Sequence, residues 1–263
     1  MSSLPEVTSA LEAIAPLRLA ADWDVVGLLV APRRAGIAKV LTCLTLTPEV
    51  AAEAVRAGAD LVVTHHPLPF RPVPRITPET GPGQVLLDLI GHGIGIWSSH
   101  TAWDSAAGGI NDQLAAILKL SGVGPIEPDA IDPRAGFGRR GRAAAGTSVA
   151  TVARSLAAAL QPPAIQIVGP PEREAGVVGI VCGSGGDLVP AVAAAGCTTL
   201  LTGELKLHQA VEARAAGLAV IALGHHTSEH FAMAELGRRL MAALPGLAVR
   251  PAEDDHDPIG WLR

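Results

Sequence analysis

Short apolar runs alternate with amphipathic segments along most of the chain. The runs predict strands at residues 39–46, 60–64, 94–99, 164–168, 177–182, 198–202 and 218–223. Helical periodicity predicts helices at residues 4–15, 48–57, 84–90, 109–120, 148–160, 188–195, 205–216 and 226–243. This regular alternation of strands and helices is typical of the α/β class.

Signals at the ends of these segments support their boundaries. Ser3 and Glu6 form the S-x-x-E pattern of a capping box, and Thr47-Pro48 and Gly58 mark the start and end of another helix. Residues 177–223 form a βαβαβ run, which predicts parallel strands joined by right-handed crossovers.

A linker or edge region is predicted at residues 122–146, which are rich in Gly, Pro, Asp and Arg. The chain is therefore expected to form two interlinked α/β lobes, with mixed or mostly parallel sheets and helices on their faces. The first lobe would combine residues 1–125 with residues 225–263 and carry the site described below. The second would comprise residues 126–224.

Composition narrows the function classes. With 49% hydrophobic and 17% charged residues among 263, the chain can bury a large core. A net charge of -5 without a basic stripe makes nucleic-acid binding unexpected, and no apolar run approaches the roughly 18 residues of a membrane span. Three distant cysteines and an N-terminus without a secretory pattern predict a cytoplasmic protein. Aromatic residues, at 3%, are too scarce to suggest ring stacking as the main binding mode.

Histidines and carboxylates gather just after predicted strands, where open α/β sheets bind their ligands. The clusters are His65 and His66, His100 with Asp104, and His225 and His226 with Glu229. Imidazole and carboxylate without thiolate suit zinc, manganese or iron. The sequence therefore predicts a metal site shared by these clusters.

Spacing within the last cluster leaves two pairings open. His225 and Glu229 are four residues apart and His226 and Glu229 three apart, so either histidine can meet the carboxylate on a helix. A glutamate close to two histidine clusters could bridge two ions, and ion pairs roughly 3.5–4 Å apart are a recurring hydrolytic device. Two carboxylates against four positive charges favour an anionic, phosphate-bearing substrate.

Two further segments carry polar groups. Residues 183–187, GSGGD, follow a strand and open a helix, so they could bind an anion through backbone amides or simply form a tight turn. Glu204 and Lys206 follow the next strand and could lie at the rim of the site. The acidic run near the C-terminus, EDDHD, is interpreted as a solvated tail.

Five motifs together carry a resemblance that spans nearly the whole chain. They are LTPEVAAEAVRAGADLVVTHHPLPF, HTAWDSAAGGINDQLA, GSGGD, TGELKLHQAVEA and GHHTSEH, in this order. The chain closely resembles the hexameric dinuclear-metal-centre family of GTP cyclohydrolase 1 type 2 homologues, also called the NGG-interacting-factor family. It is similar to the short form, which lacks the inserted domain of longer members.

The resemblance implies a specific ligand set. The implied metal ligands are His65, His66, Asp104, His225 and Glu229, with Glu229 shared between two divalent ions per subunit. His100 matches a histidine near the metals in some members, and the resemblance prefers His225 over His226. Trp103 departs from the family pattern and is expected to alter the mouth of the site.

The expected function is metal-dependent hydrolysis, in which a metal-activated water attacks a nucleotide or a phosphorylated small molecule. The family label suggests ring-opening hydrolysis of GTP, with His66 or His100 moving the proton. The alternative is a non-enzymatic metal-handling or regulatory oligomer. Either way, the resemblance implies a homohexamer of this chain.

Overall fold

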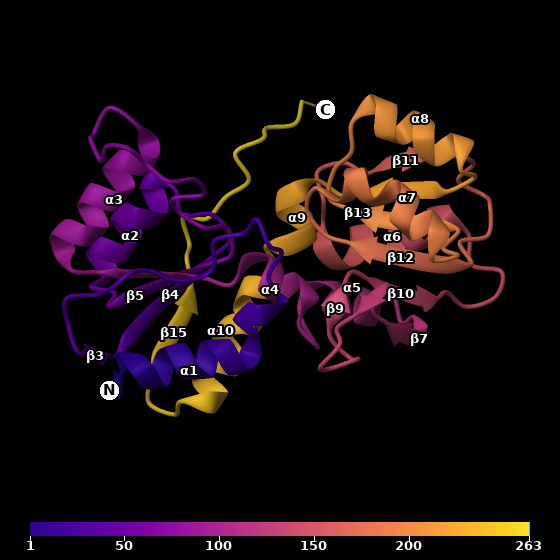
Figure 1. The fold of residues 1–263 in the computed structure, drawn as a ribbon. Coiled ribbons are helices and arrows are strands. Elements are labelled where there is room, and N and C mark those ends of the chain that lie inside the picture. Colours follow the sequence, from indigo (N-terminus) through magenta and orange to yellow (C-terminus); the bar gives the residue numbers. More distant parts are fainter. Residues whose placement is uncertain (263) are drawn as a thin grey trace. The chain divides into compact units, whose positions relative to one another are not determined.

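Two compact α/β units make up the protein. The computed structural model describes residues 1–262. The first unit contains Met1–Trp103 and Ala232–Pro258, and the second contains Asp104–Phe231 and residues 259–262. Each unit has its own sheet covered by helices, so the predicted α/β class is confirmed (Figure 1). Among the described helices, none combines the length and apolar character needed to cross a membrane.

A five-stranded sheet organises the first unit, in the order β15-β4-β5-β6-β2. Its strands are β2 (Gly27–Val30), β4 (Lys39–Cys43), β5 (Leu61–Thr64), β6 (Gly95–Ser98) and β15 (Ala248–Pro251). Its helices are α1 (Leu4–Ile14), η1 (Leu17–Leu19), α2 (Pro48–Ala57), α3 (Gly81–His92) and α10 (Ala232–Ala243), and β1 (Ser2–Ser3) pairs with β3 (Gly36–Ile37). Strands β15, β4, β5 and β6 run parallel, whereas β2 pairs antiparallel with β6.

Local sequence signals set the ends of these helices as predicted. Ser3 and Glu6 form the complete capping box of α1. The Thr47 side chain accepts a hydrogen bond from the first turn of α2, and Gly58 ends that helix with a left-handed φ of 61°.

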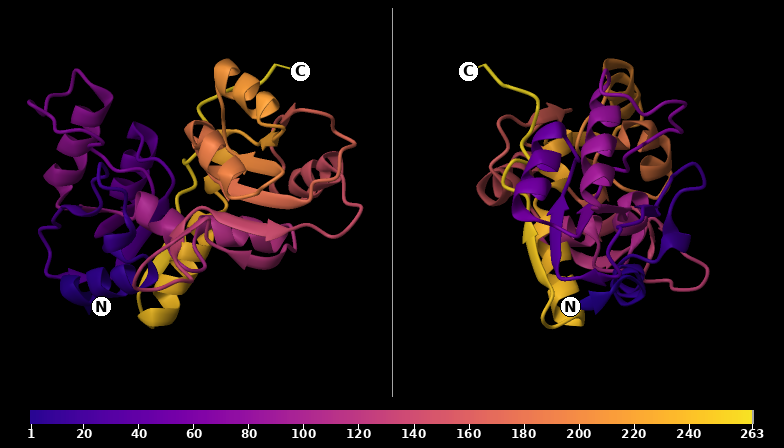
Figure 2. Two further views of the ribbon diagram at one scale, coloured as in Figure 1. Left: turned by 45° about the vertical axis from the view of Figure 1, so that its right-hand side comes forward. Right: turned by 90° about the vertical axis from the view of Figure 1, so that its left-hand side faces the viewer.

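Helices α2 and α3 lie side by side on one face of the first sheet (Figures 1 and 2). Their buried side chains, including Val50 and Leu89, pack with Leu41, Val62 and Ile96 of the strands. Helices α1 and α10 pack against each other, and α10 also contacts β4 and β15. Parallel strands are normally buried on both faces by helices, as these are. This packing fixes the positions of the carboxyl ends of β5 and β6.

The acidic C-terminal run is anchored at Asp255, so the interpretation of the whole run as a solvated tail is wrong at that residue, although Glu253 and His256 are exposed. Asp255 is 4% exposed and accepts hydrogen bonds from the backbone of Leu44 and Thr45. Glu53 accepts from the backbone N–H groups of residues 253 and 254 and from Arg250. Burial raises the pKa of Glu53, but these hydrogen bonds outweigh it and leave the pKa below its ordinary value.

A six-stranded sheet organises the second unit, in the order β11-β14-β13-β12-β10-β7. Its strands are β7 (Ser121–Gly124), β10 (Arg139–Arg142), β11 (Gln166–Val168), β12 (Val177–Val181), β13 (Thr199–Thr202) and β14 (Ala219–Ala222), and β8 (Glu127–Pro128) pairs with β9 (Gly136–Phe137). Its helices are α5 (Ile110–Ile117), α6 (Val149–Leu160), η2 (Gly185–Leu188), α7 (Val189–Ala194), α8 (Leu207–Ala215) and α9 (His225–Glu229). Strands β12, β13 and β14 are parallel, as the βαβαβ run predicted.

Helices cover this second sheet as well. Helices α7 and α8 contribute Val189, Val192 and Ala213 to a core with Leu200 and Val220 of the strands. Helices α5 and α6 pack together and contact strands β10, β12 and β14. Because alternate residues of a strand point to opposite faces, helices can cover a sheet on both sides. The carboxyl ends of β12, β13 and β14 are thereby fixed.

Two sequence expectations needed correction. The helix predicted at residues 226–243 is two helices, α9 and α10, because the chain passes from the second unit to the first after Phe231. Residues 122–146 are not only a linker, since β10 lies inside the sheet between β12 and β7. Arg139 in β10 is 0% exposed and bonds to Asp112 and to several backbone carbonyls, a burial that sequence polarity does not reveal.

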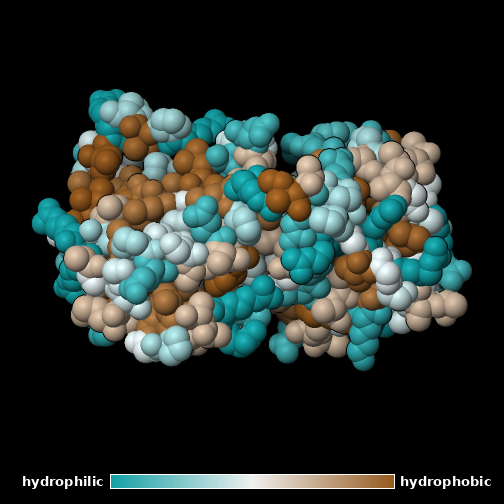
Figure 3. All heavy atoms as spheres, turned by 60° about the horizontal axis from the view of Figure 1, so that its bottom comes forward, coloured by the Kyte–Doolittle hydropathy of each residue, from teal (hydrophilic) through white to brown (hydrophobic). Residues whose placement is uncertain are grey.

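Apolar side chains also reach the surface of the first unit. Figure 3 shows a gathering of brown, apolar side chains on the part of the surface that belongs to this unit. Exposed large apolar residues of the unit include Leu28 of β2 and Leu87 and Ile90 of α3. Apolar patches on a folded protein often mark protein–protein contacts.

Candidate metal centre

Three histidines meet at the carboxyl ends of β5 and β6 in the first unit. His65 and His66 directly follow β5, and His100 follows β6. Their ring centroids are 5.1 Å, 5.2 Å and 5.6 Å apart, and one nitrogen from each ring lies within 4.8 Å of the others. A grouping of three imidazole nitrogens at this spacing can hold a divalent ion.

Backbone hydrogen bonds hold both adjacent histidines at the end of the sheet. The N–H groups of His65 and His66 bond to the carbonyls of Cys43 and Leu44, at the end of neighbouring β4. The carbonyl of His65 accepts from the His100 N–H and from the Ser98 hydroxyl. Because two consecutive N–H groups donate to the same neighbouring strand, the regular strand alternation has ended at these residues.

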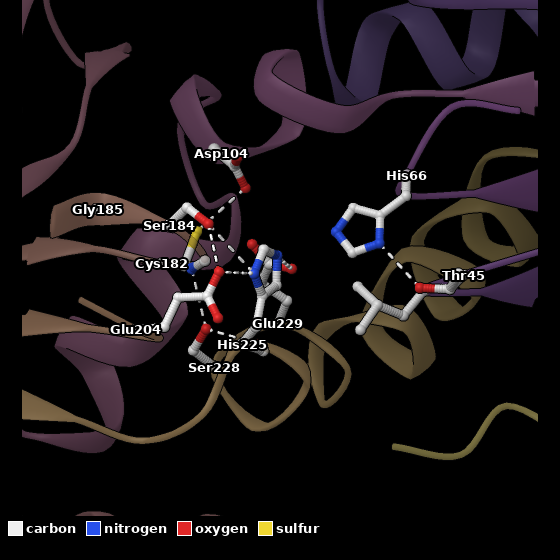
Figure 4. Close-up of polar contacts among 12 residues, drawn as sticks. Thr45, His66, Asp104, Cys182, Ser184, Gly185, Glu204, His225, Ser228 and Glu229 are labelled. Carbon is white, nitrogen blue, oxygen red and sulfur yellow. Dashed lines mark hydrogen bonds and ion pairs between the residues drawn. The ribbon is translucent and has the colours of Figure 1, made fainter. Parts of the chain in front are cut away.

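The ring of His66 has a defined outer contact. Its Nδ1 faces the Thr45 hydroxyl (Figure 4), and the two atoms are 2.8 Å apart. Nε2 is therefore the His66 nitrogen suited to coordinate an ion.

Asp24 fixes the ring of His100. Its side chain is 0% exposed, and its Oδ1 lies 2.8 Å from His100 Nδ1. Burial raises the pKa of Asp24, but hydrogen bonds from His100 and Thr101 outweigh it and hold the pKa below its ordinary value. An ionised carboxylate only accepts hydrogen bonds, so Nδ1 carries a proton, and in the neutral ring the lone pair is on Nε2. His100 also has a φ of 27°, a strained value for a residue with a side chain.

The second unit holds its own group of ligand-type side chains. His225 and Glu229 lie one turn apart on α9, with His225 Nε2 3.2 Å from Glu229 Oε2. His226 points elsewhere, and its ring stacks on that of His230 with centroids 4.5 Å apart. The geometry therefore pairs Glu229 with His225, the choice that spacing alone left open.

Glu204 orients His225 from the other side. Its Oε1 lies 3.0 Å from His225 Nδ1 and accepts a hydrogen bond of 2.6 Å from the Ser184 hydroxyl (Figure 4). Burial lowers the pKa of His225, but the hydrogen bonds and charges of Glu229 and Glu204 outweigh it and raise the pKa to about 9. In metal sites of proteins, a ligating histidine commonly donates its other ring N–H to a carboxylate that does not bind the metal.

The GSGGD segment is a tight turn that shapes this group. Its amides at Gly183 and Gly185 donate to the hydroxyls of Ser228 and Thr202, so they serve the protein rather than an anion. A Cβ on Gly183 would lie 2.3 Å from Glu229 Oε1, and Gly183 has a φ of 62°. The glycine is needed for its backbone conformation and for room beside the carboxylate.

Asp104 lies at the start of the second unit, within α4 (His100–Ser105). Its Oδ1 is 3.2 Å from the Cys182 thiol, and its carbonyl accepts from the Asn111 side chain. Burial, and then the charges of Asp104 and Glu229, raise the pKa of Cys182, so the thiol stays protonated and donates to Asp104. Asn111 also accepts from the Cys182 N–H, which completes a small frame around Asp104.

Comparison with known proteins agrees with this architecture. The family described as Duf34/NIF3 (NGG1p interacting factor 3) matches residues 2–258. The chain belongs to the DUF34/NIF3 family.

Relatives of this DUF34/NIF3 protein include two named GTP cyclohydrolase 1 type 2 homolog. The one from Streptomyces coelicolor is 36% identical over 241 residues, which cover 90% of this chain and 85% of that protein. The one from Clostridium perfringens is 33% identical over 226 residues, 86% of each. A Bacillus cereus protein related to NIF3 superposes with a TM-score of 0.91 at 19% identity, covering 99% of both chains, and thus shares the fold.

Sequence reasoning about this DUF34/NIF3 protein missed two residues that contact the predicted set. Asp24 lies 76 positions before His100, so no local spacing linked them. Cys182 is a lone cysteine without a CxxC neighbour. Trp103, expected at the mouth of the site, is instead 0% exposed, with the Arg239 guanidinium 5.0 Å from its ring centroid.

Proposed function

We propose that this DUF34/NIF3 protein is a metal-dependent hydrolase that uses two divalent ions per subunit. The proposed ligands are His65, His66, Asp104, His225 and Glu229, with Glu229 shared between the ions. The observation that carries the proposal is the outer support of these ligands: Thr45 contacts His66, Glu204 contacts His225, and Cys182 contacts Asp104. Such orienting contacts accompany metal ligands in proteins.

The donor set suits zinc, manganese or iron, because it combines imidazoles with carboxylates. Ions held in this way lower the pKa of bound water and stabilise negative charge in a transition state. Asp104 and Glu229 supply two negative charges against four positive ones, which favours an anionic substrate. We therefore propose a nucleotide or another phosphorylated small molecule.

His66 and His100 are the proposed proton carriers. Asp24 sets the proton of His100 on Nδ1, so Nε2 can accept a proton from water and return it to a leaving group. His66 would serve as a ligand through Nε2, and as the alternative proton carrier only while that nitrogen holds no ion.

A turnover screen tests this function. The protein loaded with zinc, manganese or iron is incubated with nucleoside triphosphates and phosphoesters, and both phosphate release and loss of the purine absorbance are followed. We expect metal-dependent turnover that His66→Ala abolishes and that His92→Ala, an exposed histidine of α3, leaves unchanged. Tight metal binding without turnover on any substrate class would favour the metal-handling alternative.

Assembly and location complete the proposal. The exposed apolar side chains of the first unit support self-association, and we propose a homohexamer in the cytoplasm. The three cysteines are buried free thiols, which supports a reducing compartment. A monomer by light scattering at micromolar concentration would contradict the assembly.

A further inference from the structure

Two exposed aromatic rings stand beside the histidine group of the first unit. The chain has only four tryptophans, three phenylalanines and no tyrosine. Trp23 is 64% exposed and Phe70 is 50% exposed, whereas Trp97 and Trp103 are buried. Solvent-exposed aromatic area is unfavourable in water, so two such rings in contact need an explanation.

The two rings form a cluster with His100. The centroid of Trp23 lies 6.2 Å from that of Phe70 and 5.9 Å from that of His100. Phe70 lies 6.1 Å from His100, and both aromatic rings meet the imidazole nearly edge-on, at 76° and 78°. Trp23 and Phe70 are tilted by 56°, so the two rings do not stack face to face on each other.

The backbone holds Trp23 firmly at this place. Its neighbour Asp24 accepts hydrogen bonds from His100, from Thr101 and from the Val25 N–H. The Ala21 N–H donates to the Thr101 hydroxyl, so the turn that carries Trp23 is fastened to the start of α4. Phe70 follows His66 by only four residues. The exposed rings are therefore tied to the segments that carry the proposed proton carriers.

We infer that Trp23 and Phe70 form a subsite that binds the planar heteroaromatic ring of the substrate, a nucleobase, against the indole face. The inference rests on the proposed function, in that the ring would be held next to the reacting histidines. A flat ring can stack on Trp23 and meet Phe70 at its edge, which are the favoured aromatic geometries. The scarcity of aromatic residues led to the expectation that ring stacking is not the main binding mode. The proposed subsite contradicts that expectation.

Neutral nucleosides separate ring binding from the attraction between phosphate and metal. Guanosine, adenosine, cytidine and uridine are the probes, and ribose is the control without a ring. Binding to the zinc-loaded wild-type protein is measured by calorimetry, and zinc content is measured on the same samples. Trp23→Leu keeps an apolar side chain but removes the flat ring, Trp23→Phe keeps a ring, and Leu87→Ala is a control for an exposed apolar residue on α3.

We expect at least one nucleoside to bind the wild type and ribose not to bind. Trp23→Leu should weaken that binding by roughly tenfold or more, which is the lower part of the range for loss of base stacking. Trp23→Phe and Leu87→Ala should stay within about threefold of wild type, because they keep a ring or lie outside the cluster. Zinc content should be equal in all variants.

Two results would overturn the subsite. One is that no nucleoside binds the zinc-loaded wild type, and the other is that Trp23→Leu binds as tightly as wild type. If nucleosides fail to bind and Trp23→Leu changes the oligomeric state, the rings belong to a contact between copies of the chain. Failure of the proposed hydrolase appears differently, as absent turnover or absent zinc while nucleoside binding still depends on Trp23.

Discussion

Asp24→Asn should both destabilise the protein and reverse the tautomer of His100. In the wild type, Asp24 Oδ1 accepts from His100 Nδ1 at 2.8 Å and from the Val25 N–H at 2.9 Å. Oδ2 accepts from the N–H of Thr101 at 3.2 Å and from its hydroxyl. An asparagine has one oxygen, so its NH2 group must face one of these two pairs of donors.

The amide orientation with the smaller free-energy cost can be deduced from these hydrogen-bond partners. If the NH2 faces Thr101, the part-buried Thr101 N–H loses its acceptor. If it faces His100, the imidazole can move its proton to Nε2 and accept at Nδ1, and the Val25 N–H, which then loses its acceptor, lies at an exposed position where water can replace it. A hydrogen bond to a charged group contributes about 1.5–3 kcal/mol, and the bonds to Thr101 also lose their charge assistance. We expect the free energy of unfolding to fall by about 3 kcal/mol.

Urea denaturation measures the stability, and long-range proton–nitrogen NMR on metal-free protein at pH 8.5 reads the histidine tautomers. Asp22→Asn, an exposed neighbour, is the matched control and should change neither. The account of His100 fails if Asp24→Asn keeps the proton on Nδ1, or if its stability matches that of the control. Turnover should also fall in Asp24→Asn, because the reversed tautomer of His100 presents a proton rather than a lone pair at Nε2.

Three further substitutions test other parts of the structure. Arg139→Met should lower the free energy of unfolding, measured by urea denaturation, by about 3–5 kcal/mol, because Asp112 and several backbone carbonyls lose the hydrogen bonds that Arg139 donates; a loss below about 1 kcal/mol would contradict this. Gly183→Ala should reduce bound metal in dialysed protein while the helical circular dichroism persists, because its Cβ would displace the carboxylate of Glu229; full metal content would show that Glu229 can move without consequence. Glu53→Gln should cost about 1–3 kcal/mol at pH 7, and its deficit should shrink as the pH falls below about 4.5, because a carboxyl with a lowered pKa stabilises the fold fully above its unfolded pKa and loses this stabilisation as the pH falls through its folded pKa; an equal deficit at pH 3 and pH 7 would contradict the assignment.

Local signals made part of the fold predictable. The capping box at Ser3, the Thr47 cap and Gly58 each act within one helical turn, and the structure forms them as the sequence indicated. The parallel strands at residues 177–223 were predictable because a buried strand reads as a continuous apolar run.

Elements that depend on distant partners were not predictable. Strand β10 contains three arginines, and it is stable because Arg139 finds Asp112 and backbone carbonyls from several segments. The short strands β2 and β15 lie at sheet edges, where pairing rather than pattern defines them. Asp255 is buried because it accepts from the end of β4, 211 residues earlier in the chain.

The candidate site shows the same division. Strand ends and helical spacing pointed to seven chemistry-bearing residues, although spacing alone could not choose between His225 and His226 as the partner of Glu229. Geometry shows which of the two contacts Glu229. The outer partners Asp24 and Cys182 lie 76 and 78 positions from the residues that they contact, so only tertiary structure reveals them.

The number of metal ions per subunit tests the central claim most directly. Wild type, Glu229→Ala, His65→Ala and the exposed control Glu212→Ala are dialysed against dilute zinc and analysed for metal, with circular dichroism on the same samples. We predict two ions in the wild type and in Glu212→Ala. Glu229→Ala should lose both ions, because the shared carboxylate offsets the repulsion between them, and His65→Ala should lose mainly one. A single ion in the wild type, or two ions retained by a folded Glu229→Ala, would contradict the dinuclear centre.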